Sequence, residues 1–236
     1  MCGRYTLATD LEEFLTELGL DFPPEVAHPR RYNIAPSQPI LGIVADPHPR
    51  IEIMEWGFIP SWAKPEQGMK PVINARVESI EEKKPYFRGA FHSARCAVIA
   101  DGFYEWAKRG KEKQPYRIML RSGSPFAMAG LWSNYNGGDG SERATCAIIT
   151  TRPNELMGGI HDRMPAILGT SDIPHWLDPR TRERDLFSLL EPYPADQMKA
   201  YEVGRHVNSP AMDQPSCIES VSGDERDEES GGTTGR

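Results

Sequence analysis

A cysteine directly follows the first methionine of this 236-residue chain, in the run Met1-Cys2-Gly3-Arg4-Tyr5. Removal of Met1 would leave Cys2 with an α-amine and a thiol on adjacent carbons, with free pKa values of about 7.7–8.0 and about 8.5. The amine can condense with an aldehyde to an imine, which the thiol closes into a thiazolidine ring. Alternatively, the thiolate attacks an acyl carbon with the amine as its base. Position alone favours an ordinary terminal residue, so the rest of the chain must decide.

Two further side chains are candidates for acid–base chemistry. Glu105 is a carboxylate within the aromatic run Phe103-Tyr104-Glu105-Trp106. If buried, its pKa would rise and suit it to proton transfer, whereas an exposed Glu105 is only the polar half of an alternating strand. His161 lies in the run Gly158-Gly159-Ile160-His161-Asp162-Arg163, where the glycine pair is expected to let the backbone approach another group closely. A lone histidine is usually structural, but this tight-turn context favours a functional role.

Short strands must position these groups. Apolar patterns predict strands over residues 40–44, 51–56, 95–100, 116–120, 126–132, 144–150 and 198–203. Helices are predicted over residues 9–18, 79–84 and 185–190. Many short strands with few helices favour one α+β domain whose curved, largely antiparallel, barrel-like sheet is flanked by short helices. We place this domain at residues 1–217.

Charge is unevenly distributed along the chain. The net charge of -7 argues against a general polyanion binder. Residues 218–236 hold six acidic and two basic residues without an aromatic, which predicts a disordered acidic tail. Residues 70–117 hold eleven Lys or Arg against six Asp or Glu. That basic segment is consistent with a local anionic ligand and equally with a solvated basic face.

Cysteine spacing and hydropathy exclude other classes. The four cysteines lie far apart without a Cys-x-x-Cys pair, so a disulfide scaffold or metal knuckle is not indicated and we expect neither metal nor cofactor. Cys96 and Cys146 lie in apolar strand-like runs and are expected to be buried and inert. No apolar run approaches membrane-spanning length and no signal-peptide pattern is present, so we expect a cytoplasmic protein, nucleoid-associated in a bacterium.

Six runs occur in order along the chain: Met1-Cys2-Gly3-Arg4-Tyr5, Tyr32-Asn33-Ile34-Ala35-Pro36, Trp56-Gly57-Phe58-Ile59-Pro60-Ser61-Trp62, Asn74-Ala75-Arg76-Val77-Glu78, Cys96 to Trp106, and His161-Asp162-Arg163-Met164-Pro165. Together they resemble the SRAP family, the SOS-response-associated peptidases, whose members sense abasic sites in single-stranded DNA. The resemblance extends to about Asn208, nearly the whole chain except the acidic tail.

This resemblance implies a chemistry for the first candidates. Cys2, once Met1 is removed, is implied to be the nucleophile that forms a thiazolidine crosslink with the ring-opened sugar aldehyde, shielding the lesion from strand cleavage. Asn74 is implied to position the amine and the lesion. Glu105 and His161 are implied to transfer protons around the sugar. The resemblance also implies peptidase-type activity and a lyase-type side reaction. In the lyase reaction, elimination from the protonated imine would nick the DNA strand.

The resemblance also implies a DNA surface. Arg76 and Arg163 are similar to arginines that hold DNA phosphates. Arg4, Trp62 and the loop from Asn33 to Pro39 are similar to surfaces that line a kinked single strand. Arginines on phosphates and aromatic surface against unstacked bases suit such a ligand. The implied partner is single-stranded DNA that contains abasic sites, bound by a monomer without a membrane.

The residues leave three alternatives open. An N-terminal cysteine also suits an amidotransferase that attacks a glutamine amide, which ammonia release from glutamine would identify. A non-covalent single-strand binder in which Cys2 is incidental predicts no adduct on a denaturing gel. A general protease needs a substrate cleft with an oxyanion hole, which nothing in the sequence resembles. Removal of Met1 by Cys2 itself would be a limited form of that activity.

Overall fold

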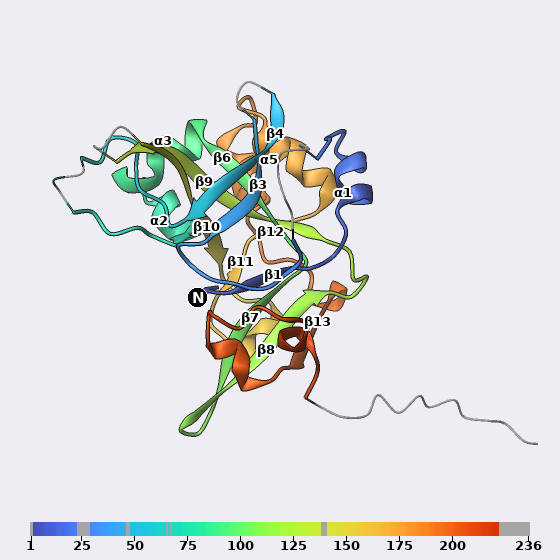
Figure 1. The fold of residues 1–236 in the computed structure, drawn as a ribbon. Coiled ribbons are helices and arrows are strands. Elements are labelled where there is room, and N and C mark those ends of the chain that lie inside the picture. Colours follow the sequence, from blue (N-terminus) through green and yellow to red (C-terminus); the bar gives the residue numbers. More distant parts are fainter. Residues whose placement is uncertain are drawn as a thin grey trace, which may run out of the picture.

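The computed structural model describes residues 2–22, 29–45, 48–64, 66, 68–137 and 141–221 (Figure 1). The predicted disorder of residues 222–236 therefore lies outside the described residues. Residues 218–221 do belong to the fold, because Ser220 bridges to Val203 and the Val221 N–H donates to the Glu202 carbonyl. The folded chain thus continues past the predicted boundary at residue 217.

Five strands close into a ring. They are β3 (Pro39–Ala45), β4 (Pro49–Trp56), β10 (Glu142–Thr151), β9 (Phe126–Asn136) and β6 (Arg95–Ala100). Each pairs with the next in that order, and β6 pairs back with β3. The ring pairings are antiparallel except between β4 and β10, which run parallel with Glu55 opposite Thr145. The short strands β5 (Asn74–Arg76), β11 (Met164–Pro165) and β12 (Ile167–Leu168) extend this sheet.

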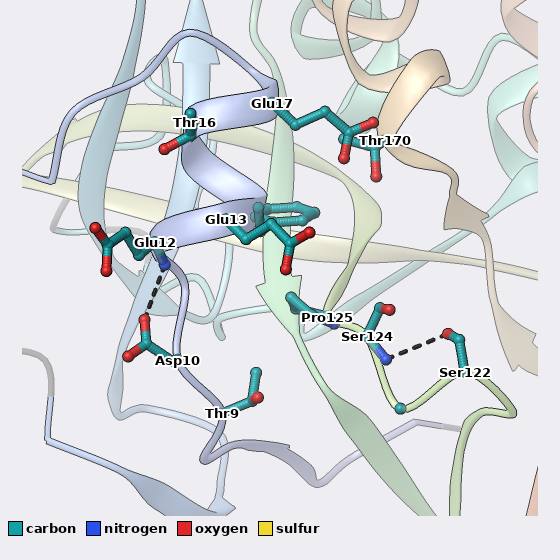
Figure 2. Close-up of a pocket in the computed structure, with 12 residues that line it drawn as sticks. Thr9, Asp10, Glu12, Glu13, Thr16, Glu17, Ser122, Ser124, Pro125 and Thr170 are labelled. Carbon is teal, nitrogen blue, oxygen red and sulfur yellow. Dashed lines mark hydrogen bonds between the residues drawn. The ribbon is translucent and has the colours of Figure 1, made fainter.

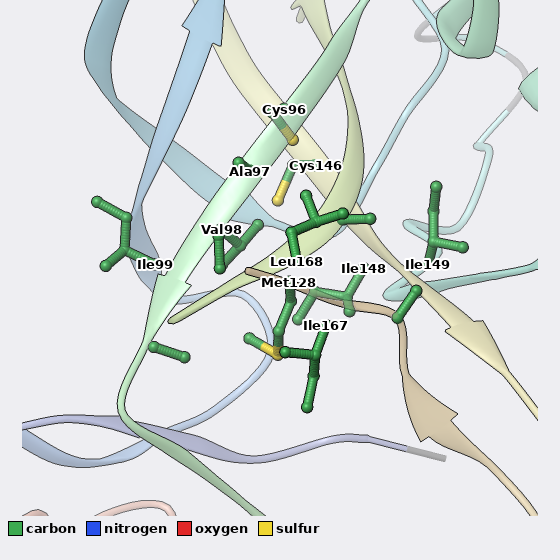
Figure 3. Close-up of a cluster of buried hydrophobic side chains, with 14 of the residues drawn as sticks. Cys96, Ala97, Val98, Ile99, Met128, Cys146, Ile148, Ile149, Ile167 and Leu168 are labelled. Atoms are coloured by element: carbon green, nitrogen blue, oxygen red, sulfur yellow. The ribbon is translucent and has the colours of Figure 1, made fainter. Parts of the chain in front are cut away.

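The ring packs around an apolar core (Figure 3). Side chains from separate strands meet there, among them Val98, Met128 and Ile148, all of them fully buried. Cys96 and Cys146 lie beside each other in this cluster as free, buried thiols, which confirms their predicted burial. At Gly130 a Cβ atom would lie 2.8 Å from Cys96 Sγ, so only glycine lets β9 pass that close.

A second, antiparallel sheet holds the chain start. Its strand order is β13 (Met198–Glu202), β8 (Glu112–Leu120), β7 (Gly102–Arg109), β1 (Tyr5–Leu7) and β2 (Arg31–Ile34). Tyr5 lies between Ile34 of β2 and Phe103 of β7. The strand that follows Cys2 is therefore held on both sides, close to where the two sheets meet (Figure 1).

Short helices flank the two sheets. They are α1 (Glu12–Glu17), α2 (Val77–Glu81), α3 (Pro85–Ser93), α4 (Glu155–Gly158), α5 (Ile173–Leu177) and α6 (Glu183–Ser188), with 3-10 turns η2 (Thr170–Asp172), η3 (Ala195–Gln197), η4 (Arg205–Asn208) and η5 (Pro215–Ile218). Within the described ranges, no helix has the length and apolar character needed to span a bilayer. The predicted α+β class, with a largely antiparallel, barrel-like sheet and short helices, is confirmed; its strands form two sheets.

A buried carboxylate ties the first strand to the second sheet. Asp101 is 3 % exposed and accepts hydrogen bonds from the Thr6 hydroxyl and from Arg117 Nη2 at 3.1 Å. It also accepts from the backbone N–H groups of Ala8 at 2.7 Å and Thr9 at 2.8 Å. Because Asp101 precedes β7 and Arg117 lies in β8, this network fixes β1, and with it Cys2, against its neighbours.

Candidate functional site

Cys2 lies just before β1 and is fully buried. Its thiol Sγ lies 4.0 Å from the Arg4 carbonyl oxygen. Burial raises the pKa of the Cys2 thiol far above its usual range, and the nearby Glu105 carboxyl adds to that rise. A thiol in this environment stays protonated at neutral pH, so it needs a neighbouring base or a change in its surroundings to react.

Asn74 holds the backbone of Cys2 from the other sheet. It lies in β5, which runs parallel to β10 with Asn74 opposite Ile148. Its side-chain Nδ2 donates to the Cys2 carbonyl oxygen at 2.9 Å. Its Oδ1 is buried and accepts no hydrogen bond from the described residues. A buried amide oxygen without a donor is unfavourable in the folded chain, and it suits the binding of an amine or hydroxyl.

Glu105 and His161 form an acid–base pair beside Cys2. Glu105 lies in β7 and is 2 % exposed, while the half-buried His161 places Nε2 3.9 Å from Glu105 Oε2. Burial raises the Glu105 pKa, and the His161 ring opposes part of that rise. On the other side of the ring, Nδ1 lies 3.1 Å from the backbone nitrogen of Arg163 and 2.9 Å from Asp162 Oδ1. These contacts direct Nε2 towards Glu105.

A single capped turn sets the position of His161. The Asn154 side chain accepts from the Met157 N–H at 2.9 Å and so begins α4, and the buried Met157 accepts from the His161 N–H at 2.8 Å. The glycine pair Gly158-Gly159 was expected to allow close backbone approach. No group of the protein itself makes that approach, because a Cβ atom at either position would meet no atom within 4 Å; close approach of an external group stays a prediction.

The two arginines predicted to hold phosphates have different surroundings. Arg76 at the end of β5 is exposed and makes no ion pair with the described residues. Arg163 is 9 % exposed, and its guanidinium donates to both oxygens of Glu78, at 2.6 and 2.9 Å, and to the Thr150 carbonyl. The hydrogen bonds from Arg163 also lower the pKa of Glu78. Arg163 is therefore already held by an anion of the protein itself.

The other predicted DNA contacts divide between surface and interior. Trp62 is 56 % exposed, and Pro39 is exposed at the start of β3. Asn33 is fully buried, and its Nδ2 donates to three carbonyls of residues 207–212 while its Oδ1 accepts from Arg4. Its side chain is therefore internal, which corrects the prediction that Asn33 lines the DNA. Arg4 is turned towards the same segment, donating to the Val207 carbonyl at 2.8 Å.

A groove of about 1020 Å³ lies elsewhere, between α1 and the turn after β8 (Figure 2). Its walls carry the carboxylates of Asp10, Glu12, Glu13 and Glu17. None of the predicted site residues lines it. Carboxylates repel phosphates, so this groove is no candidate for a DNA surface despite its size. Within the described residues, no group of three or more His, Cys, Asp or Glu side chains is placed to hold a metal ion.

Comparison with known proteins adds to this geometry. The model of the SOS response associated peptidase (SRAP) family matches residues 1–210. The chain belongs to the SRAP family. It is 47% identical over 224 residues to the abasic site processing protein YoqW of Bacillus subtilis, a match that covers 93% of this chain and 100% of that protein.

A more distant relative and a solved structure also match most of the chain. The abasic site processing protein YedK of Escherichia coli is 30% identical over 218 residues, covering 89% of this chain and 95% of YedK. A crystal structure of a protein from Bacteroides thetaiotaomicron matches with a TM-score of 0.83 and 27% identity, over 93% of this chain and 100% of that one. The SRAP match thus includes all four converging residues, Cys2, Asn74, Glu105 and His161.

The different surroundings of the two SRAP arginines predict different phenotypes. Arg76→Ala is expected to weaken binding to single-stranded DNA and reduce the salt slope by about 0.7, the contribution of one phosphate contact, without changing stability. Arg163→Ala is expected to lower the free energy of unfolding by about 1–3 kcal/mol, because the largely buried guanidinium's hydrogen bonds to Glu78 and to the Thr150 carbonyl are lost. Fluorescence anisotropy at several salt concentrations and urea denaturation measure the two effects. Equal loss of stability in both variants would contradict this distinction.

Proposed function

We propose that this protein recognises abasic sites in single-stranded DNA and captures them covalently through Cys2 after Met1 has been removed. The observation that carries the proposal is the convergence of a nucleophile, an amide and an acid–base pair from four separate segments of the chain. The names of relatives such as YoqW and YedK, which process abasic sites, support the same substrate.

The first step is opening of the sugar. An abasic deoxyribose is mostly a closed hemiacetal, so a base must take the hydroxyl proton at C1 while an acid protonates the ring oxygen. Glu105 and His161 lie 3.9 Å apart and can exchange these two roles. Burial raises the pKa of Glu105 and so favours its protonated form, which suits it to act as the acid.

Capture of the aldehyde follows. The Cys2 amine adds to C1, and protonation of the resulting hydroxyl lets water leave to give an imine. The thiol then adds across the C=N bond, its sulfur to carbon and its proton to nitrogen, so that aldehyde and aminothiol yield a thiazolidine and one water. Asn74 holds the Cys2 carbonyl with Nδ2, which leaves Oδ1 to accept from the amine or from a sugar hydroxyl.

Removal of Met1 is required because only then does Cys2 carry an amine. The burial of Cys2 keeps its thiol protonated and supports a latent nucleophile until the lesion and the acid–base pair act on it. Cleavage of the Met1–Cys2 bond by the thiol itself would be the limited peptidase activity that the family name describes. Ring closure also competes with elimination from the imine, and so protects the strand.

The test uses two oligonucleotides that differ by one oxygen atom. The purified protein is incubated with single strands containing either a true abasic site or a tetrahydrofuran analogue, which has no hydroxyl at C1 and cannot open. We expect an adduct on a denaturing gel with the first strand only, with the mass of the protein lacking Met1 plus the strand minus one water. Ammonia release from glutamine without any adduct would overturn the proposal in favour of an amidotransferase.

Glu105→Gln is expected to slow adduct formation at least about 100-fold, the lower end of general acid–base contributions. The same change is expected to leave stability at pH 7 equal or higher. Burial raises the Glu105 pKa in the folded protein above the unfolded value of about 4.3. Between these two pKa values the unfolded chain binds fewer protons than the folded protein. The free energy of unfolding therefore falls as pH rises through this range. Glutamine removes that fall. Adduct kinetics and urea denaturation across pH check both parts, and an unchanged rate would make Glu105 structural.

A further inference from the structure

The hairpin of β7 and β8 projects from the second sheet to the far end of the molecule from α5 (Figure 1). Its outer part is basic. Lys108 and Arg109 end β7, Lys111 lies in the turn, and Lys113 is near the start of β8; all four are exposed. This cluster lies in a chain whose net charge is -7, so it does not follow from overall composition.

The lysines of this hairpin have no anionic partner among the described residues. The carboxylate of Glu202 is paired with Arg109, and the carboxylate of Glu112 is paired with Arg205. Lys108, Lys111 and Lys113 make no ion pair with any described residue. We refer to these three residues as the lysine hairpin. Its positive charge is thus available to an external anion.

Two of these lysines face each other directly. Lys108 lies opposite Lys113 in the antiparallel register. Like charges at directly opposite positions destabilise a strand pair, whereas a lysine opposite a glutamate would stabilise it. The arrangement therefore weakens the isolated hairpin, and an anion that lies across both side chains would offset this repulsion.

The lysine hairpin continues from the strand that carries Glu105. Lys108 is three residues beyond Glu105, which is about 10 Å along an extended strand. Lys108 shares its face of β7 with the half-buried Trp106, because alternate residues of a strand point the same way, whereas Glu105 points to the opposite face. The Arg4 guanidinium lies 5.9 Å from the centre of the Trp106 ring. A row of cation, aromatic ring and cations is typical of surfaces that follow a single nucleic-acid strand.

We propose that the lysine hairpin binds phosphates of the DNA strand a few nucleotides away from the abasic sugar, on one side of the lesion only. This inference rests on the proposed function, because it places the sugar beside Glu105. The hairpin leaves the body of the protein in one direction, so it can follow the strand towards only one of its two ends (Figure 1).

The test compares two triple variants that remove the same charge. In the first, Lys108, Lys111 and Lys113 are replaced by glutamine. In the control, Arg180, Arg182 and Arg184 are replaced by glutamine; these exposed residues follow α5, at the other end of the molecule. The probes are two fluorescent single strands with a tetrahydrofuran site, one extended by ten nucleotides on the 5′ side and the other on the 3′ side.

We expect the lysine variant to reduce the salt slope of binding by about 2 with one probe and to leave it unchanged with the other. The arginine variant should leave both slopes unchanged. Equal slopes for the two variants on both probes would overturn the inference. Full adduct yield from the lysine variant with excess abasic strand at low salt shows that its fold and site are intact. Absence of an adduct from the wild-type protein would instead refute the proposed function, while the salt slopes still report on the hairpin.

Discussion

Cys2→Ala is expected to abolish the stable adduct with an abasic strand while non-covalent binding to that strand persists. The variant retains an N-terminal amine after loss of Met1, so the imine still forms, but no thiol closes it into a ring. Alanine is smaller than cysteine and fits the fully buried position without a clash. A denaturing gel measures the adduct, and anisotropy with the tetrahydrofuran strand measures binding.

A reductant distinguishes the role of the Cys2 amine from the role of its thiol. Borohydride reduces an imine to a stable amine, so Cys2→Ala should give an adduct only when borohydride is present. The wild-type protein should give one without it. An undiminished adduct from Cys2→Ala in the absence of borohydride would refute the central role of the thiol. An intact-mass measurement shows in which of the two proteins Met1 has been removed, and so whether the thiol is needed for that removal.

Asp101→Ala is expected to destabilise the fold by about 3–5 kcal/mol, because it leaves the buried Arg117 guanidinium without its counter-charge. The loss should also slow adduct formation, since Asp101 binds the backbone at the end of β1 and so holds Cys2 in place. Urea denaturation measures the stability, and the gel assay measures the rate under conditions where the variant is folded.

The double variant Asp101→Ala/Arg117→Met distinguishes charge from packing. Removing both charges should restore much of the stability, because no uncompensated ion remains in the interior. The matched surface change is Glu52→Ala, which breaks the exposed pair with Arg50 and should have little effect. If Asp101→Ala were as mild as Glu52→Ala, the buried pair would have no role in holding β1.

Local residue patterns and the family resemblance together identified the residues that meet at the site. Glu105 and His161 were candidates from their sequence context and Asn74 from the resemblance, and the structure brings all three around Cys2. The direction of a side chain was harder to infer. Asn33 looks like an exposed loop residue, yet three carbonyls of residues 207–212 surround its amide. Those carbonyls come from a distant part of the chain, so the sequence around Asn33 does not predict these hydrogen bonds.

Long-range pairing explains what else sequence reasoning missed. Asp101 and Arg117 form a buried ion pair that sequence reasoning did not single out, because no local pattern distinguishes a buried ion pair from two solvated charges. Apolar periodicity predicted most strands, but it does not state which strands pair. The parallel contact between β4 and β10, which closes five strands into a ring, therefore could not be inferred, and one sheet was predicted where two exist.

The pairing of β5 with β10 also determines when the site can form on the ribosome. Cys2 is synthesised first, but β5, which carries Asn74, has no strand to lie against until residues 142–151 have emerged. His161 follows later still. Synthesis proceeds at about 5–20 residues per second. For several seconds the nascent chain therefore contains Cys2 but lacks the residues that surround Cys2 in the folded site. Translation itself therefore delays reactivity until almost the whole domain is available.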